Sequence, residues 1–133
     1  MKSLALAVSV AFVLTGCSDS PTGPTQVSVV GTWNLETGNG APPPVITVQT
    51  GHDRTEIMGN VLTFLAKGGF TQVTTVRSTL NGVVTTKTFS NTGTYTADGT
   101  AVTYRVNGFS GPPFTGIVSG STFTVGSAVY RKQ

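Results

Sequence analysis

The sequence predicts an all-β protein: a single antiparallel up-and-down meander closed into a small barrel of about eight strands, following a signal peptide and a short disordered tether. Two observations lead to this fold class. The 133-residue chain holds 24 threonines and 17 glycines, and many β-branched residues separated by frequent glycines are typical of short strands joined by turns. From Val29 onward, apolar and polar residues alternate between turn signals, and no helical period appears after residue 17.

The chain begins with a short apolar segment. Lys2 precedes an almost unbroken apolar run from Leu4 to Leu14. A membrane-spanning helix needs about 20 apolar residues, so this run is too short to span a bilayer but has the length of a secretory signal core. It ends in "LTGC", which resembles the lipobox of bacterial lipoproteins. The resemblance implies removal of residues 1–16 and acylation of Cys17, the only cysteine. An ordinary secretory signal with a chance cysteine is the alternative.

Residues 17–28 are predicted to be the lipidated cysteine and a flexible tether. Pro21, Gly23 and Pro24 disfavour a helix, and no residue from 18 to 26 is apolar enough to pack. Ser18 follows the cysteine; by the same resemblance, the lack of Asp there favours the outer membrane. We therefore expect a lipid-anchored protein of the bacterial cell envelope, with its folded domain at residues 29–133 close to the membrane.

The expected strands follow one another through tight turns. Asn81-Gly82 and Asp98-Gly99 are strong hairpin signals, and Lys67-Gly68-Gly69 and Gly120-Ser121 mark two further turns. Consecutive strands should therefore be antiparallel neighbours, and closure into a barrel would remove the exposed edges. We expect eight or nine strands from segments at residues 27–36, 45–50, 59–67, 70–79, 83–91, 93–97, 100–106, 114–119, 122–125 and 128–132.

The motif "GTW" at Gly31 to Trp33 opens the first strand of this meander. A Gly-x-Trp at this point resembles the lipocalins and their calycin relatives, in which a basic residue of the last strand packs over the tryptophan. The resemblance implies a barrel-closing pair of Trp33 and Arg131, with Lys132 as second choice. Such a contact would contribute about 0.5–2 kcal/mol through a cation–π interaction. It also implies that the barrel binds or carries a small apolar molecule.

Six residues are candidates for contact with such a ligand. Four are expected on the inner wall near an open mouth, and Phe109 and Phe114 flank a proline pair in a segment expected at the rim. The two rim rings could instead cap the barrel core, or form an apolar patch for a protein partner. The alternative function is therefore a structural or protein-interaction module of the envelope with a filled core. The candidates are Leu62, Phe64, Tyr95, Tyr104, Phe109 and Phe114.

Ionisable residues are concentrated in residues 50–59, predicted to be a solvated loop that could also act as a lid. His52, Asp53 and Glu56 could in principle serve as metal ligands or an acid–base pair, but a loop does not hold catalytic geometry. We expect no enzyme activity, no catalytic residue, no metal and no cofactor. The chain also lacks a basic run and any interleaving of basic and aromatic residues, so nucleic acid is not an expected partner.

Overall fold

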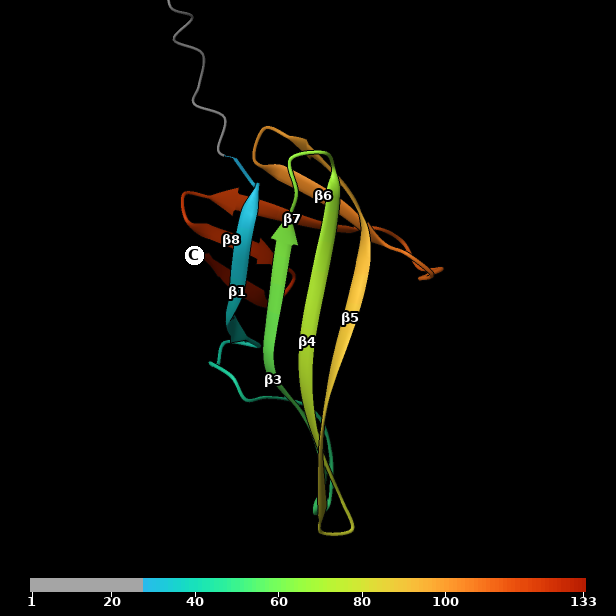
Figure 1. Cartoon of the computed structure of the whole chain (residues 1–133). Coiled ribbons are helices and arrows are strands. Elements are labelled where there is room, and N and C mark those ends of the chain that lie inside the picture. The colour runs from blue at the N-terminus through green and yellow to red at the C-terminus, as the bar shows by residue number, and fades with distance from the viewer. Residues whose placement is uncertain (1–27) are drawn as a thin grey trace, which may run out of the picture.

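The computed structural model describes residues 28–133, and these residues form nine β-strands (Figure 1). The predicted signal peptide, Cys17 and almost all of the predicted tether lie outside the described residues. The strands are β1 (Gly31–Gly38), β2 (Val45–Thr50), β3 (Asp53–Phe64), β4 (Gly69–Leu80), β5 (Val83–Asp98), β6 (Ala101–Val106), β7 (Phe114–Ser119), β8 (Thr122–Val125) and β9 (Ala128–Lys132).

The strands form one antiparallel sheet that closes on itself. Neighbours follow chain order from β3 to β9, and β1 pairs with β9 on one side and with β3 on the other. Gly31 lies opposite Phe64, and Leu35 lies opposite Tyr130. The predicted eight-stranded antiparallel barrel is therefore confirmed. The ninth strand, β2, lies outside the ring and pairs with Asp53–Ile57 of β3.

Three strands are longer than the barrel needs. β3 and β4 have 12 residues each and β5 has 16, and Figure 1 shows the β4–β5 hairpin extending far beyond the shorter strands. We call this extension, residues 45–57 and 75–91, the ribbon. The two strands expected at 83–91 and 93–97 are one strand, because Thr92 between them pairs with Thr71 in an uninterrupted ladder.

The prediction of a loop at residues 50–59 was wrong. Only Gly51 and His52 form a turn, and β3 begins at Asp53. The charged residues are accommodated in the strand because the Arg77 Nε on β4 lies 2.8 Å from the Glu56 carboxylate. The buried residue of this segment is therefore a charged one, Glu56, held by an arginine of the neighbouring strand.

The barrel interior is filled with aromatic side chains. Trp33, Phe64, Phe70 and Phe123 are almost completely buried, and the Phe64 and Phe123 rings meet edge to face at 5.6 Å. Such tilted contacts are the favoured geometry for aromatic pairs. Every strand and every residue of this core lies within residues 29–132, so a chain that begins at Ser18 retains the whole barrel.

Candidate functional site

One end of the barrel is closed around Trp33. The Trp33 Nε1 donates a hydrogen bond of 2.7 Å to the Val29 carbonyl oxygen. The Lys132 Nζ lies 5.3 Å from the centroid of the Trp33 ring and donates a hydrogen bond of 2.8 Å to the Ser28 carbonyl oxygen. The backbone just before β1 and the last residues of β9 therefore seal this end.

The basic residue over Trp33 is Lys132, the second choice, and the expectation for Arg131 is corrected. Side chains alternate along β9, so the same side of the strand carries the buried Tyr130 and Lys132. Arg131 projects from the opposite side, where its Nη2 lies 2.9 Å from the Glu36 carboxylate. Both members of that ion pair are about half exposed, so it lies on the outer wall.

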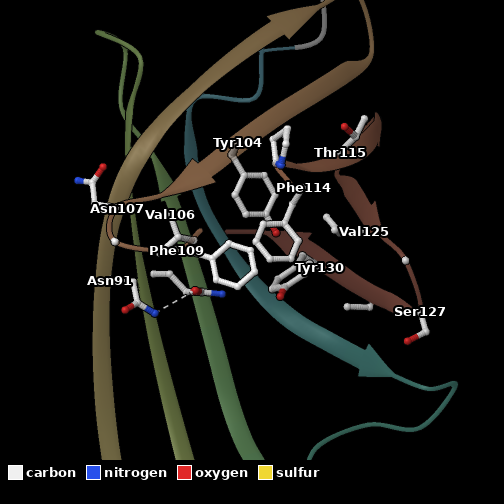
Figure 2. Close-up of a pocket in the computed structure, with 15 residues that line it drawn as sticks. Asn91, Tyr104, Val106, Asn107, Phe109, Phe114, Thr115, Val125, Ser127 and Tyr130 are labelled. Atoms are coloured by element: carbon white, nitrogen blue, oxygen red, sulfur yellow. Dashed lines mark hydrogen bonds between the residues drawn. The ribbon is translucent and has the colours of Figure 1, made fainter. Parts of the chain in front are cut away.

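The other end of the barrel opens into a cavity of about 890 Å³. Aromatic rings dominate one wall, as Figure 2 shows: Phe114 stacks on Tyr104 with ring centroids 5.2 Å apart, and Phe109 stacks on Phe114 at 5.5 Å. The cavity lies at the far end from Trp33, because it is lined by the β6–β7 loop and the β8–β9 turn. The lining residues are Gln72, Asn91, Tyr104, Val106, Asn107, Gly108, Phe109, Pro113, Phe114, Thr115, Val125, Gly126, Ser127, Ala128 and Tyr130.

The β6–β7 loop has a conformation that presents Phe109 to this cavity. Gly108 has a φ of +79°, which glycine adopts without strain. At Gly111 the backbone runs against the Phe109 ring, and a Cβ there would overlap the ring. The Gly111 carbonyl oxygen also accepts a hydrogen bond of 3.4 Å from the Arg105 guanidinium. The loop is thus folded against its own aromatic side chain.

Amide side chains form the facing wall of the cavity. The Asn91 Nδ2 donates to the Gln72 Oε1 at 3.4 Å, a bond drawn in Figure 2, and the Gln72 Nε2 donates to the Asn60 Oδ1 at 3.5 Å. The Asn60 Nδ2 donates in turn to the Thr74 hydroxyl at 2.9 Å. These long bonds leave donors and acceptors of Gln72 and Asn91 available at the cavity surface.

Burial raises the pKa of both tyrosines of the cavity. Desolvation raises the pKa of Tyr104 to about 12, and it also raises the pKa of Tyr130, with a further contribution from the nearby Tyr104. No Asp, Glu, Lys, Arg or His is among the residues that line the cavity. The site therefore offers aromatic surface, amides and hydroxyls, and no formal charge at neutral pH.

The cavity brings together three of the six candidate ligand residues: Tyr104, Phe109 and Phe114. Leu62 and Phe64 are fully buried in the core beneath it. Tyr95 lies near the closed end, where its hydroxyl donates a hydrogen bond of 2.6 Å to the Leu65 carbonyl oxygen.

Tyr130, Gln72 and Asn91 are among the lining residues that were not candidates. For Tyr130, the alternation of "AVYRK" on the last strand was a usable signal. The two amides could be selected only from the pairing of β4 with β5, which places Gln72 opposite Asn91.

Four ionisable residues of the ribbon are held by hydrogen bonds and ion pairs. The Asp53 Oδ1 accepts a hydrogen bond of 2.8 Å from the Asn81 backbone N–H. Glu56 lies between Arg54 and Arg77, with its Oε2 at 3.3 and 2.8 Å from their Nε atoms. The hydrogen bond from Arg77 lowers the pKa of Glu56. Within residues 28–133, no three His, Cys, Asp or Glu side chains gather in a way that could hold a metal ion.

In the described part of the chain, no helix has the length and apolar character needed to cross a bilayer. Comparison with protein-family models, with curated proteins and with solved structures finds no match to this chain.

Proposed function

We propose that this protein binds a small, uncharged and mainly apolar molecule in the cavity at the open end of its barrel. The observation that supports the proposal is the volume and lining of that cavity. About 890 Å³ is within the range of small-molecule sites, which combine apolar and aromatic walls with a few placed polar groups. A charged ligand would lack a counter-charge in this lining.

The lining also favours a ligand with a flat apolar part. The stacked rings of Phe109, Phe114 and Tyr104 offer aromatic faces, and a planar ring or an apolar sugar face packs well on such a surface. On the facing wall, Gln72 and Asn91 each carry an amide, which donates and accepts hydrogen bonds. A ligand with one apolar face and one or two uncharged polar groups would use both walls.

The proposed location is the bacterial cell envelope, with the chain anchored through lipidated Cys17. The first described residues lie at the closed end of the barrel, next to Trp33. A tether that enters at this end would leave the cavity facing away from the membrane that holds the anchor. The ligand would then enter from the aqueous side.

The experiment is native mass spectrometry of the chain from Ser18 to Gln133 after incubation with a lipid extract of its own membranes. We expect a discrete adduct of small-molecule mass. Phe114→Ala removes a ring that forms part of the cavity wall and should abolish the adduct. Leu65→Ala, which truncates an exposed apolar side chain that does not line the cavity, is the control and should retain it.

A spectrum that shows only the mass of the chain without an adduct, after incubation with the extract, would contradict ligand binding. That result would favour the second candidate, a structural or protein-interaction module of the envelope. One observation supports this alternative: below the mouth the interior is filled, and Trp33, Leu62 and Phe123 are completely buried.

A further inference from the structure

The ribbon leaves one long strand edge without a partner. β5 pairs with β4 from Val83 onward, but with β6 only from Gly93 to Asp98. Among residues 28–133, no strand pairs with the other edge of β5 between Val83 and Asn91. All residues of this segment are exposed, and Figure 1 shows it as the outer strand of the projecting hairpin.

The turn before β5 determines which backbone groups this edge presents. Asn81 and Gly82 have φ values of +49° and +79°, as in a two-residue type I′ hairpin, so Leu80 and Val83 form the first hydrogen-bonded pair.

Hydrogen bonding alternates along β5, so the backbone groups of its odd-numbered residues bond to β4. The even-numbered residues Val84, Thr86, Thr88 and Ser90 direct their N–H and C=O groups outward. Thr92 continues this series, and its carbonyl accepts the Asn107 N–H on that side at 2.9 Å.

Proline, bulges and charged residues, lysine above all, usually prevent strand addition, and this edge carries few of them. The other edge of the ribbon, β2, follows three prolines and has a register shift between Ile46 and Val48. β5 has an uninterrupted register against β4. From Val83 to Asn91 it contains no proline and one charged residue, Lys87.

We infer that this edge of β5 pairs with the same edge of a second copy of the chain, antiparallel, with Thr86 on the two-fold axis. Antiparallel neighbours point their side chains to the same face, so one residue must pair with itself on the axis. With Thr86 there, Val83 lies opposite Phe89 of the second copy, and Thr85 lies opposite Lys87. Pairs of an aromatic and a β-branched residue are favourable across strands.

The next two registers toward Asn91 are worse. An axis at Lys87 would place two ammonium groups opposite each other, which is destabilising. An axis at Thr88 would place Val84 opposite Thr92, whose carbonyl already accepts the Asn107 N–H. With the axis at Thr86, the paired segment ends at Ser90 opposite Gly82, before that bond. Of these three registers, the edge therefore favours the one with Thr86 on the axis.

This pairing would also cover exposed apolar surface. Val83 and Phe89 are 66% and 50% exposed, and both line a groove of about 590 Å³ on one face of the ribbon. In the dimer the two grooves would lie on the same face of one continuous sheet. Two Val83–Phe89 contacts would then lie between the chains. The inference does not depend on ligand binding at the barrel mouth.

The test is analytical ultracentrifugation of the chain from Ser18 to Gln133. Chain concentrations up to roughly 100 μM are used, because even a weak dimer is populated there. We expect a dimer for the native chain and a monomer for Thr86→Lys and for Thr86→Glu separately, because each places like charges on the axis. An equal mixture of the two variants should restore the dimer. Thr100→Lys, in the exposed β5–β6 turn at the other end of β5, is the control and should remain dimeric.

A second measurement tests the register. Cys17 is the only cysteine of the chain, so a chain from Ser18 has none. A mixture of Val83→Cys and Phe89→Cys chains should form a disulfide-linked dimer on oxidation, whereas Val83→Cys alone should not. Fluorescence of Trp33, the single tryptophan, verifies that each variant is folded.

Three results would overturn the inference. One is a native chain that stays monomeric at every concentration. Another is a dimer that persists unchanged in both separate Thr86 variants, since it would use a different surface. The last is a mixture of the two charged variants, each folded by Trp33 fluorescence, that stays monomeric.

Discussion

Lys132 and Trp33 close the barrel together, since the Lys132 Nζ lies 5.3 Å from the Trp33 ring centroid and is hydrogen-bonded to the carbonyl of Ser28. Gly31 completes this arrangement. Its φ of +131° is rarely adopted by other residues, and a Cβ at this position would lie 2.9 Å from the Lys132 Cε. The Gly-x-Trp motif therefore has a physical reason here: the glycine gives the lysine stem its path to the indole.

Lys132→Met is expected to destabilise the barrel, whereas Arg131→Met is not. The methionine retains an unbranched apolar stem but loses the cation–π contact and the hydrogen bond to Ser28, so the free energy of unfolding should fall by about 1–3 kcal/mol. Arg131 takes part in an exposed pair with Glu36, for which about 0–1 kcal/mol is expected. Urea unfolding followed by Trp33 fluorescence measures both values. Equal losses in the two variants would contradict the role assigned to Lys132.

The meander could be predicted because its turns are local. Asn81-Gly82 forms the turn expected of it, and the hairpin signalled by Asp98-Gly99 also forms, but its turn is Gly99-Thr100, one residue later than expected. The selection of Arg131 over Lys132 failed although the signal was present: the period of two that buries Tyr130 also directs Lys132 inward.

The cavity could be predicted only in part, because its walls come from strands far apart in sequence. Its two wall amides, Gln72 and Asn91, are linked to each other and to Asn60 outside the cavity lining through the alignment of β3, β4 and β5. That alignment includes a register shift in β3 between Ile57 and Gly59. An isolated glycine in a strand is a sign of a bulge, but the prediction of a loop at residues 50–59 left this signal unused. The rim rings Phe109 and Phe114 could be proposed because the proline pair between them marks a loop.

Gly93→Ala is expected to be strongly destabilising, with Gly59→Ala as its control. A Cβ at Gly93 would overlap the Arg105 carbonyl oxygen and lie 2.5 Å from Phe70 Cε1, so the buried ring and the strand would both have to shift. Overpacking of this kind costs about 1–3 kcal/mol. A Cβ at Gly59 would meet no atom within 4 Å, so that variant should be near neutral or slightly stabilising. Thermal unfolding measures the difference, and equal melting temperatures would contradict the packing at Gly93.

Glu56 is expected to contribute to acid sensitivity. The hydrogen bond from Arg77 lowers the pKa of Glu56 below 4.5 in the folded state. The unfolded chain therefore binds the proton first as the pH falls, so the stabilisation is present above about pH 4.5 and is lost as the pH falls through the folded-state pKa. Glu56→Gln removes this dependence, and the stability gap between native and variant chains should narrow on acidification.

Urea unfolding of both chains at neutral and acidic pH measures this gap. Glu36→Gln, which breaks the exposed pair with Arg131, is the matched control and should alter stability little at either pH. A gap between native and Glu56→Gln chains that stays constant or widens on acidification would contradict the ion pair with Arg77.

Tyr104 is expected to ionise late and to limit stability in alkali. Burial raises its pKa to about 12 in the folded state from the ordinary value of 10.0. Between these values the unfolded chain loses the proton while the folded chain keeps it, so the free energy of unfolding should fall as the pH rises from about 10 to about 12.

An ultraviolet absorbance titration measures phenolate formation directly. Tyr104→Phe should remove one tyrosine from the late part of the curve, and Tyr130→Phe should remove another, because burial raises the pKa of Tyr130 as well. If Tyr104→Phe instead removed signal that appears near pH 10, the ring would be solvated, and the cavity would lack the dry aromatic wall that the proposed ligand needs.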